Sequence, residues 1–272
     1  MAQALDTPQA AAVAFHGVTK SFVTRDDAVV SALQDVSFDV APGEFVAIVG
    51  PSGCGKSTTL NILAGLLQPT RGSATIRGRS PAEARFDVGY VFQQDTVLPW
   101  KRVRENVELG LVIRKVAPLR RRERAAHLLE MMGLAGFEDA YPHELSGGMR
   151  KRVGLATTLA YNPSILLMDE PFGSLDAQTR VLMQDELLRV WEAERRTVLF
   201  VTHDLPEAIS LADRVIVMTA RPARIKMQYR VDLPRPRSAV DARFHPNFEA
   251  LHMRIWSDLR PELSVQAKLD DA

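Results

Sequence analysis

The sequence contains one cysteine, Cys54, among its 272 residues. A single cysteine cannot form an intramolecular disulfide, and it excludes zinc sites that are built from several cysteines. An excess of charge of one sign is also missing, because 34 Lys and Arg residues face 33 Asp and Glu residues and the formal net charge is +1. Proteins that coat nucleic acid need a basic excess or a basic face, so this balance argues against a nucleic-acid partner.

Long apolar runs are lacking as well. No stretch approaches the roughly 18–20 apolar residues that a membrane-spanning helix needs. The start, MAQALDTPQAA, has neither a basic beginning nor an apolar segment, so no secretory signal is visible. Hydrophobic residues make up 46 % and charged residues 25 % of the chain, as is usual for globular proteins. We therefore expect a soluble, cytoplasmic globular protein.

Short apolar runs rich in β-branched residues alternate with longer stretches of helical periodicity. The predicted strands cover 44–50, 164–170, 197–203 and 214–220, and the predicted helices include 56–67, 149–161 and 177–194. Strands that alternate with helices predict an α/β domain with a mostly parallel core sheet.

Three regions depart from that alternation. Residues 12–46 are typical of short strands and predict an N-terminal antiparallel β subdomain. Residues at about 95–160 have helical patterns without a buried strand and predict an inserted helical subdomain. We therefore expect one domain over residues 12–235, followed by a short helical tail over residues 236–272 whose amphipathic part runs from Asn247 to Leu259.

Residues 50–57 fit the pattern G-x-x-x-x-G-K-[ST] between a predicted strand and a predicted helix. Glycines let successive backbone N–H groups converge on phosphate oxygens, and the helix N-terminus adds its positive end. The pattern predicts nucleotide contacts from Gly50, Pro51, Ser52, Gly53, Cys54, Gly55, Lys56, Ser57 and Thr58. Lys56 is expected to reach the β- and γ-phosphates and Ser57 to ligate Mg²⁺. The alternative is a structural glycine turn with an exposed lysine; for Cys54, a reactive thiol competes with a small residue that the loop tolerates.

Two acids and a histidine follow predicted strands. Asp169 and Glu170 end the run 164–170, and His203 ends the run 197–203. We expect the strand 164–170 to lie beside the strand 44–50, which would place both acids near the phosphates. There Asp169 would hold Mg²⁺, Glu170 would orient and deprotonate water, and His203 would bond to the γ-phosphate or the water. Taken alone, an acid pair at a strand end is as often structural, and a lone histidine is usually so.

The segment Leu145–Met149, LSGGM, precedes a predicted helix. Ser146, Gly147 and Gly148 could form a second anion site, since a hydroxyl and two glycines expose backbone N–H groups at a helix start. One bound nucleotide does not need two such sites, so the second site is expected to serve the nucleotide of another copy of the chain.

Together these motifs make the chain resemble the ATP-binding subunits of ABC transporters over nearly its full length. The shared motifs, in the family's order, are GPSGCGKST, Gln93 of GYVFQQ, LSGGM, ILLMDEP, SLD at 174–176 and His203 of VTHD. The resemblance implies ATP and Mg²⁺ as ligands and a head-to-tail dimer with two ATP molecules. It further implies that Phe22 stacks on adenine, that Gln93 joins Mg²⁺ and the water, and that Asp176 lies at the dimer seam.

The signature departs from the family at Met149, where the usual residue is Gln. Signatures that end in Met resemble those of importers for nitrate, sulfonates, taurine and related small molecules. Softer resemblances to these importers are QQDTVLPW (93–100), PFGSLDAQTR (171–180), ARPARI (220–225) and LPRPR (233–237). The expected function is therefore an importer ATPase at the cytoplasmic face of the membrane, with separate permease subunits and, indirectly, a solute-binding protein.

Alternatives remain at this stage. A soluble ATPase of the same class acting on nucleic acid or ribosomes usually carries two cassettes, a long coiled coil or zinc-binding cysteines, which this sequence lacks. An unrelated phosphate-loop kinase would leave LSGGM unexplained. Trp100 either lines a groove for a permease helix or is buried in the core, and the arginines at 120–124 are best explained as a solvated helix face.

Overall fold

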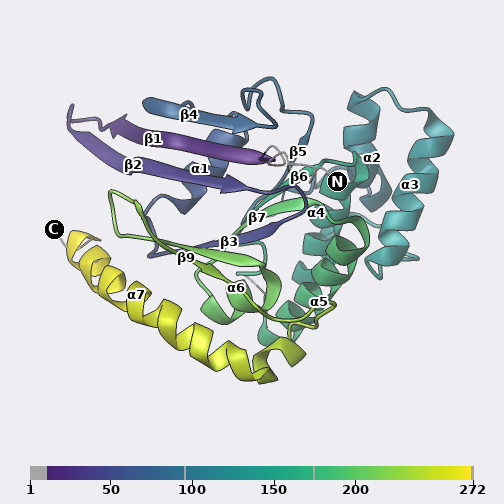
Figure 1. Ribbon diagram of the computed structural model, residues 1–272. Helices are drawn as coiled ribbons and strands as arrows, with labels where there is room; N and C mark the ends of the chain where they lie inside the picture. Colours follow the sequence, from purple (N-terminus) through teal and green to yellow (C-terminus); the bar gives the residue numbers. More distant parts are fainter. Residues whose placement is uncertain (1–10, 95, 174, 271–272) are drawn as a thin grey trace, which may run out of the picture.

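The computed structural model describes residues 11–94, 96–173 and 175–270; Ser174 of the SLD motif and most of the N-terminal start lie outside the described residues. Its centre is a six-stranded sheet in the order β5-β6-β7-β3-β8-β9, in which only the β8–β9 pair is antiparallel (Figure 1). The strands are β3 (Phe45–Val49), β5 (Val88–Val91), β6 (Ile165–Asp169), β7 (Thr197–Val201), β8 (Arg214–Met218) and β9 (Ile225–Arg230). The predicted α/β class with a mostly parallel sheet is confirmed.

Both faces of this sheet are covered, which explains why its central strands β3, β6, β7 and β8 are nearly continuous apolar runs without polar alternation. All five residues of β3 are buried. Ala47 and Val49 pack into a core on one face, together with Leu187 of a covering helix, whereas Val46 and Ile48 pack into a second core on the other face. Period-two alternation along one strand thus supplies two hydrophobic cores.

A separate antiparallel sheet in the order β2-β1-β4 covers the second core, together with α1 (Lys56–Leu63). Its strands are β1 (Val13–Val23), β2 (Val29–Val40) and β4 (Arg71–Ile76). The predicted antiparallel subdomain is confirmed, but β1 and β2 have 11 and 12 residues and are not short. Their outer halves are only partly buried, so these strands extend beyond the packed core. The prediction omitted β4, whose first three residues, Arg71–Ser73, are exposed.

Helices cover the other core. After β5 come α2 (Val103–Ile113), α3 (Pro118–Met131), a short 3-10 turn (Pro142–Glu144) and α4 (Gly147–Ala160); α5 (Ala177–Glu194) and α6 (Leu205–Leu211) follow β6 and β7. Figure 1 shows α2 and α3 at one end of the molecule, beyond α4. Within the arginine cluster of α3, Arg121 pairs with Glu108 at 3.5 Å and Arg124 with Glu194 at 3.9 Å, so part of this face contacts neighbouring helices.

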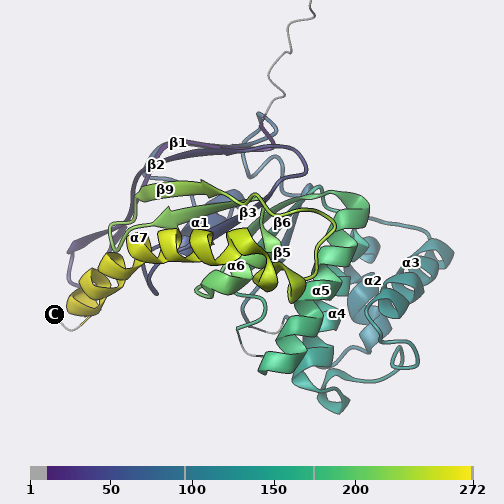
Figure 2. The same cartoon turned by 60° about the horizontal axis from the view of Figure 1, so that its bottom comes forward.

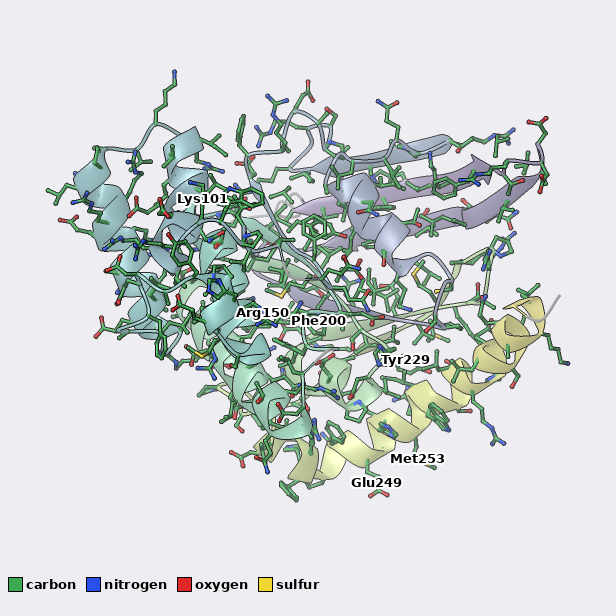
Figure 3. All side chains as sticks on the ribbon, turned by 180° about the vertical axis from the view of Figure 1, so that it is seen from behind. Lys101, Arg150, Phe200, Tyr229, Glu249 and Met253 are labelled. Carbon is green, nitrogen blue, oxygen red and sulfur yellow. The ribbon has the colours of Figure 1, made fainter. Side chains whose placement is uncertain are left out.

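The C-terminal tail forms α7 (Pro246–Asp270), which follows a 3-10 turn (Asp241–Phe244) and extends beyond the predicted amphipathic stretch. Figure 2 shows α7 running along the same side of the molecule as α6 and β9. Leu251, Ile255 and Leu259 are buried in the same core as β8, whereas Met253 and Glu249 point away from the sheets (Figure 3). Neither α7 nor another helix within the described ranges is both long and apolar enough to span a membrane.

One predicted neighbour relation is wrong. The strand that ends in Asp169 does not lie beside the strand that leads into the phosphate loop, because β7 lies between β6 and β3. Thus β7, which precedes His203, separates β3, which leads into the phosphate loop, from β6, which ends at Asp169. Asp169 still lies near the loop, because α1 begins at the carboxyl ends of these strands and packs against both β6 and β7.

Candidate functional site

The loop of residues 50–55 joins β3 to α1 and folds around the Lys56 side chain. Lys56 Nζ donates hydrogen bonds to the carbonyl oxygens of Gly50 at 2.9 Å and Pro51 at 2.8 Å. The side chain is only 5 % exposed, although its ammonium group carries a charge. The ammonium is therefore held within the loop, at the start of a helix whose N-terminal end favours anions.

Gly55 is the position at which this loop has no room for a side chain. Its φ of +129° lies in a region that L residues rarely adopt, and a Cβ there would lie 2.9 Å from both Ala32 O and Leu33 Cδ2. The close approach of β2 to the loop thus requires glycine at this position.

The Ser57 hydroxyl donates a hydrogen bond to Asp169 Oδ1 at 3.0 Å, and Tyr90 OH donates to the other carboxylate oxygen, Oδ2, at 3.4 Å. Burial raises the pKa of Asp169 above its ordinary value, while the hydrogen bond from Ser57 and the charge of Lys56 act in the opposite direction. Sequence reasoning missed Tyr90. Its approach to Asp169 depends on the pairing of β5 with β6, which only the tertiary structure shows.

The Glu170 carboxylate contacts two other predicted site residues, Gln93 and His203. Gln93 Nε2 donates to Glu170 Oε2 at 3.3 Å, and His203 Nδ1 lies at hydrogen-bond distance, 3.0 Å, from the same oxygen. Glu170 has a φ of +44°, which is unfavourable for a residue with a side chain. A hydrogen bond from Glu170 N to Val201 O at 2.9 Å fixes this conformation. Backbone strain of this kind concentrates at functional sites.

A cavity of about 330 Å³ lies over the loop. It is lined by Ser52, Gly53, Gly55, Lys56, Ser57, Thr58, Gln93 and Glu170. The backbone N–H groups and Lys56 in its walls can bind an anion, and Glu170 can accept a proton. The cavity therefore fits a polyphosphate that reacts with water.

The residues around this cavity also fit Mg²⁺. Within the described residues no group of three or more His, Cys, Asp or Glu side chains could hold a metal ion by itself. Mg²⁺ is usually held by one or two protein oxygens together with phosphate oxygens and water, and it prefers such hard ligands. The Ser57 hydroxyl and the Asp169 carboxylate, already in contact, are a suitable pair of oxygen donors.

Four further predicted contact residues lie outside this cavity. Ser146 caps α4, where its hydroxyl accepts from Met149 N at 3.3 Å, and Gly147 and Gly148 begin that helix. Phe22 lies in β1, 39 % exposed, with Lys20 Nζ 5.1 Å from its ring centre. None of the four is part of the cavity lining. One chain therefore brings together the loop, Gln93, Asp169, Glu170 and His203, but not the Ser146 segment.

A second residue that sequence reasoning missed is Lys151 of α4. Its Nζ donates to the backbone oxygen of Gln93, which links the helix that Ser146 caps to the residue that contacts Glu170. The helical pattern of 149–161 contained this lysine, yet only the tertiary structure identifies its acceptor.

The structure also decides between the alternatives for two other residues. Cys54 is buried, and burial raises the pKa of its thiol, which disfavours a reactive thiolate. Trp100 is 70 % exposed and is therefore not a core residue.

Comparison with known proteins gives a consistent result. The family model described as "ABC transporter" matches residues 33–173. An uncharacterized ABC transporter ATP-binding protein of Methanocaldococcus jannaschii is 50 % identical over 79 % of this chain and 80 % of its own length. The taurine import ATP-binding protein TauB of Rhizobium johnstonii is 48 % identical over 79 % of this chain and 82 % of its own length. The nitrate import ATP-binding protein NrtC of Synechococcus elongatus is 43 % identical over 85 % of this chain, but this match covers 36 % of NrtC.

Among solved structures, the ATP-binding cassette MJ0796, in a dimeric post-hydrolysis state bound to ADP and Pi, superposes with a TM-score of 0.73. The match has 34 % sequence identity and covers 82 % of this chain and 100 % of that one. A second dimeric structure of MJ0796 matches equally well.

Proposed function

Since this chain belongs to the ABC transporter family and is an ATPase of that family, we propose that it drives the import of a small solute through a separate permease. The solute class is nitrate, a sulfonate, taurine or a related compound. The chain's similarity to import ATP-binding proteins for taurine and nitrate supports this class. The segment LSGGM, which ends in Met149 as the signatures of such importers do, also supports this class.

The observation that carries the catalytic part of the proposal is the convergence of Gln93 and His203 on one oxygen of Glu170 beside the phosphate loop. In this proposal the N–H groups of residues 50–58 and the Lys56 ammonium bind the phosphates of ATP. Glu170 orients the attacking water and accepts its proton as the water oxygen bonds to the γ-phosphorus and ADP leaves. His203 bonds to the γ-phosphate or to the water. Gln93 contacts the water and, with Mg²⁺ bound, would also join the ion.

Ser57, Asp169 and Gln93 would hold Mg²⁺, with Asp169 bound directly or through water. When bound, the ion supplies positive charge that compensates the phosphate oxygens. The Ser57–Asp169 hydrogen bond supports this assignment, because it brings two oxygen donors together beside the cavity.

A second copy of the chain completes each site in this proposal. Dimers of a similar cassette are known from its solved structures. The segment Ser146–Gly148 is a helix N-terminus outside the chain's own cavity, so it is available to the nucleotide of the partner. Phe22 would stack on adenine, and Asp176 would lie at the seam between the two copies.

The proposed location is the cytoplasmic face of the membrane, with permease subunits as direct partners and a solute-binding protein as an indirect one. The indole of Trp100 is 70 % exposed, so it is accessible to a permease helix, and aromatic side chains are enriched at protein interfaces.

Two variants test the catalytic part. Lys56→Ala should reduce ATP turnover by about 100-fold or more, because it removes the charge at the transferring phosphate. Glu170→Gln should keep ATP binding and stop hydrolysis, so that an ATP-bound dimer accumulates on size-exclusion chromatography. Full turnover by Lys56→Ala, or a monomer in Glu170→Gln with ATP, would contradict these roles.

The transport part is tested by identifying what co-purifies with the tagged chain from gently solubilised membranes of its own cell. A multi-span permease is the expected result, and solutes such as nitrate, sulfonates and taurine can then be screened for stimulation of its ATPase activity. Recovery of ribosomes or nucleic acid without a membrane protein would instead support the alternative, an ATPase of this family that acts on those partners.

A further inference from the structure

The turn that carries His203 is anchored on both sides of the histidine. We call residues 202–204 the histidine turn. Thr202, 2 % exposed, donates its hydroxyl proton to Glu207 Oε2 and accepts a hydrogen bond from Asp204 N at 3.0 Å. Glu207 N donates to Asp204 Oδ1 at 2.9 Å. Both neighbours of His203 are therefore fixed to Glu207, while the imidazole itself is exposed and reaches Glu170.

Glu207 is an unusual residue for this place, because it is 3 % exposed and a buried carboxylate is costly unless its oxygens are hydrogen-bonded. The second oxygen accepts from Gln184 Nε2 at 2.8 Å. Gln184 is fully buried, and within the described residues its Oε1 has no hydrogen-bond partner. Loss of either partner of Glu207 would leave a buried carboxylate oxygen without its hydrogen bond, so Thr202, Gln184 and Glu207 are coupled to one another.

The histidine turn and Glu207 are also linked to the start of α5. Gln184 and Arg180 lie one turn apart on α5, and both reach the segment that begins with the histidine turn: Gln184 contacts Glu207, and Arg180 Nη1 lies 3.6 Å from Asp204 Oδ2. Arg180 Nη2 also donates to Leu175 O at 3.0 Å. The N-cap of α5 is the next residue, Asp176. One rigid helix thus connects residues 175–176 with the histidine turn.

We propose that Glu207 is a positioning residue for ATP hydrolysis, which holds His203 at Glu170 through Thr202 and ties that geometry to α5 through Gln184. Glu207 is not part of the lining of the phosphate cavity, and its two carboxylate oxygens accept hydrogen bonds from Thr202 and Gln184, so it acts through other residues. An exposed imidazole on an unanchored turn would sample several positions, and a displacement of about 1 Å at a reacting group costs up to about 100-fold in rate. The inference rests on the proposed role of His203.

The experiment compares matched variants in two backgrounds, the parent chain and His203→Ala. Glu207→Met removes both acceptor oxygens at similar volume. Glu207→Gln retains an acceptor for Thr202 and an amide that can pair with Gln184. Thr202→Val removes only the hydroxyl, and Thr202→Ser retains it. For each variant we would measure kcat and KM for ATP, nucleotide affinity in the presence of Mg²⁺, and the thermal unfolding midpoint.

In the parent background we expect Glu207→Met and Thr202→Val to lower kcat by about tenfold or more with nearly unchanged nucleotide affinity, because they misplace a reacting group. Glu207→Gln and Thr202→Ser should retain most of the activity. In the His203→Ala background none of the four should lower the residual kcat further, since the residue through which they act is gone. If Glu207→Met does not fold, the Thr202→Val and Thr202→Ser pair decides alone.

Three results would overturn the inference: parental kcat in both Glu207→Met and Thr202→Val, equal losses in the conservative and disruptive variants, or losses that multiply with that of His203→Ala. The proposed function has its own readout in the same series. Parental kcat in His203→Ala alone would refute the role of the histidine itself, and any remaining effect at Glu207 would then have another cause.

Discussion

Ser57 and Asp169 are 112 positions apart in the sequence, and the hydroxyl of the first donates a hydrogen bond to the carboxylate of the second at 3.0 Å. The contact joins the first turn of α1 to the end of β6 and crosses the carboxyl end of β7, which lies between β6 and β3. This arrangement places an oxygen donor from each of two distant motifs at the same edge of the cavity.

The first prediction concerns this pair. Asp169→Asn removes the negative charge that attracts Mg²⁺ and retains the shape of the side chain. The Mg²⁺ concentration that gives half-maximal ATPase activity should rise by about 10–100-fold, the usual range for groups that hold or orient a metal. A magnesium titration at saturating ATP measures it, with exposed Asp241→Asn as the matched control. An unchanged magnesium requirement would remove Asp169 from the metal site.

The second prediction compares two glycines that both have positive φ. A Cβ at Gly55 would lie 2.9 Å from backbone and side-chain atoms of β2, whereas a Cβ at Gly78 would have nothing within 4 Å. Gly55→Ala should therefore shift the phosphate loop and weaken ATP binding by about tenfold or more, since a 1.4 kcal/mol loss already suffices. Gly78→Ala should cost about 1 kcal/mol in stability, because the left-handed backbone alone disfavours a side chain. Nucleotide titration and denaturant unfolding of both variants provide the comparison; equal ATP affinity would show that the loop tolerates a side chain at position 55.

The third prediction concerns the contribution of α7 to stability. Ile255 is fully buried in the core that β8 shares, and Met253, two residues away, is 62 % exposed. Ile255→Ala should lower the free energy of unfolding by about 2–5 kcal/mol through lost apolar contacts and a residual cavity. Met253→Ala should change it by no more than about 0.5 kcal/mol. Urea unfolding curves test this, and similar midpoints for the two variants would mean that α7 does not unfold with the core.

The fourth prediction concerns pH. Burial raises the pKa of Glu207 above its ordinary 4.5, and the nearby charge of Asp204 acts in the same direction; the hydrogen bonds from Thr202 and Gln184 and the charge of Arg180 lower it. Because the folded state then binds this proton more tightly than the unfolded state, the contribution of Glu207 to stability falls as the pH rises through and above 4.5. Glu207→Gln cannot ionise and should lack this loss.

The measurement is the free energy of unfolding of the parent and of Glu207→Gln between pH 4 and pH 7. The difference between them should change in favour of the variant as the pH increases. A difference that moves in favour of the parent would mean that the native state stabilises the ionised carboxylate instead.

The candidate site divides into parts that differ in how far the sequence predicts them. The phosphate loop depends on consecutive residues, since glycine positions and a following helix impose its backbone locally, and the pattern of residues 50–57 therefore locates it without a structure. Asp169, Glu170 and His203 follow buried strands, and parallel strands end at one edge of a sheet, so their approach to the loop follows from strand direction alone. Tyr90 and Lys151 have no such local signal, because their partners come from other elements.

The amino-acid sequence by itself determined the α/β class, the family and the identity of the polar groups near the phosphates, because periodicity and short motifs are properties of neighbouring residues. The tertiary structure decided that β7 separates β6 from β3, that β1 and β2 form long strands of their own sheet, and that α7 covers the core beside β8. It also decided that Glu207 is buried against Gln184 beneath the histidine turn. These features follow from how two faces of one sheet are covered at once, and such packing is selected by contacts between residues far apart in the chain.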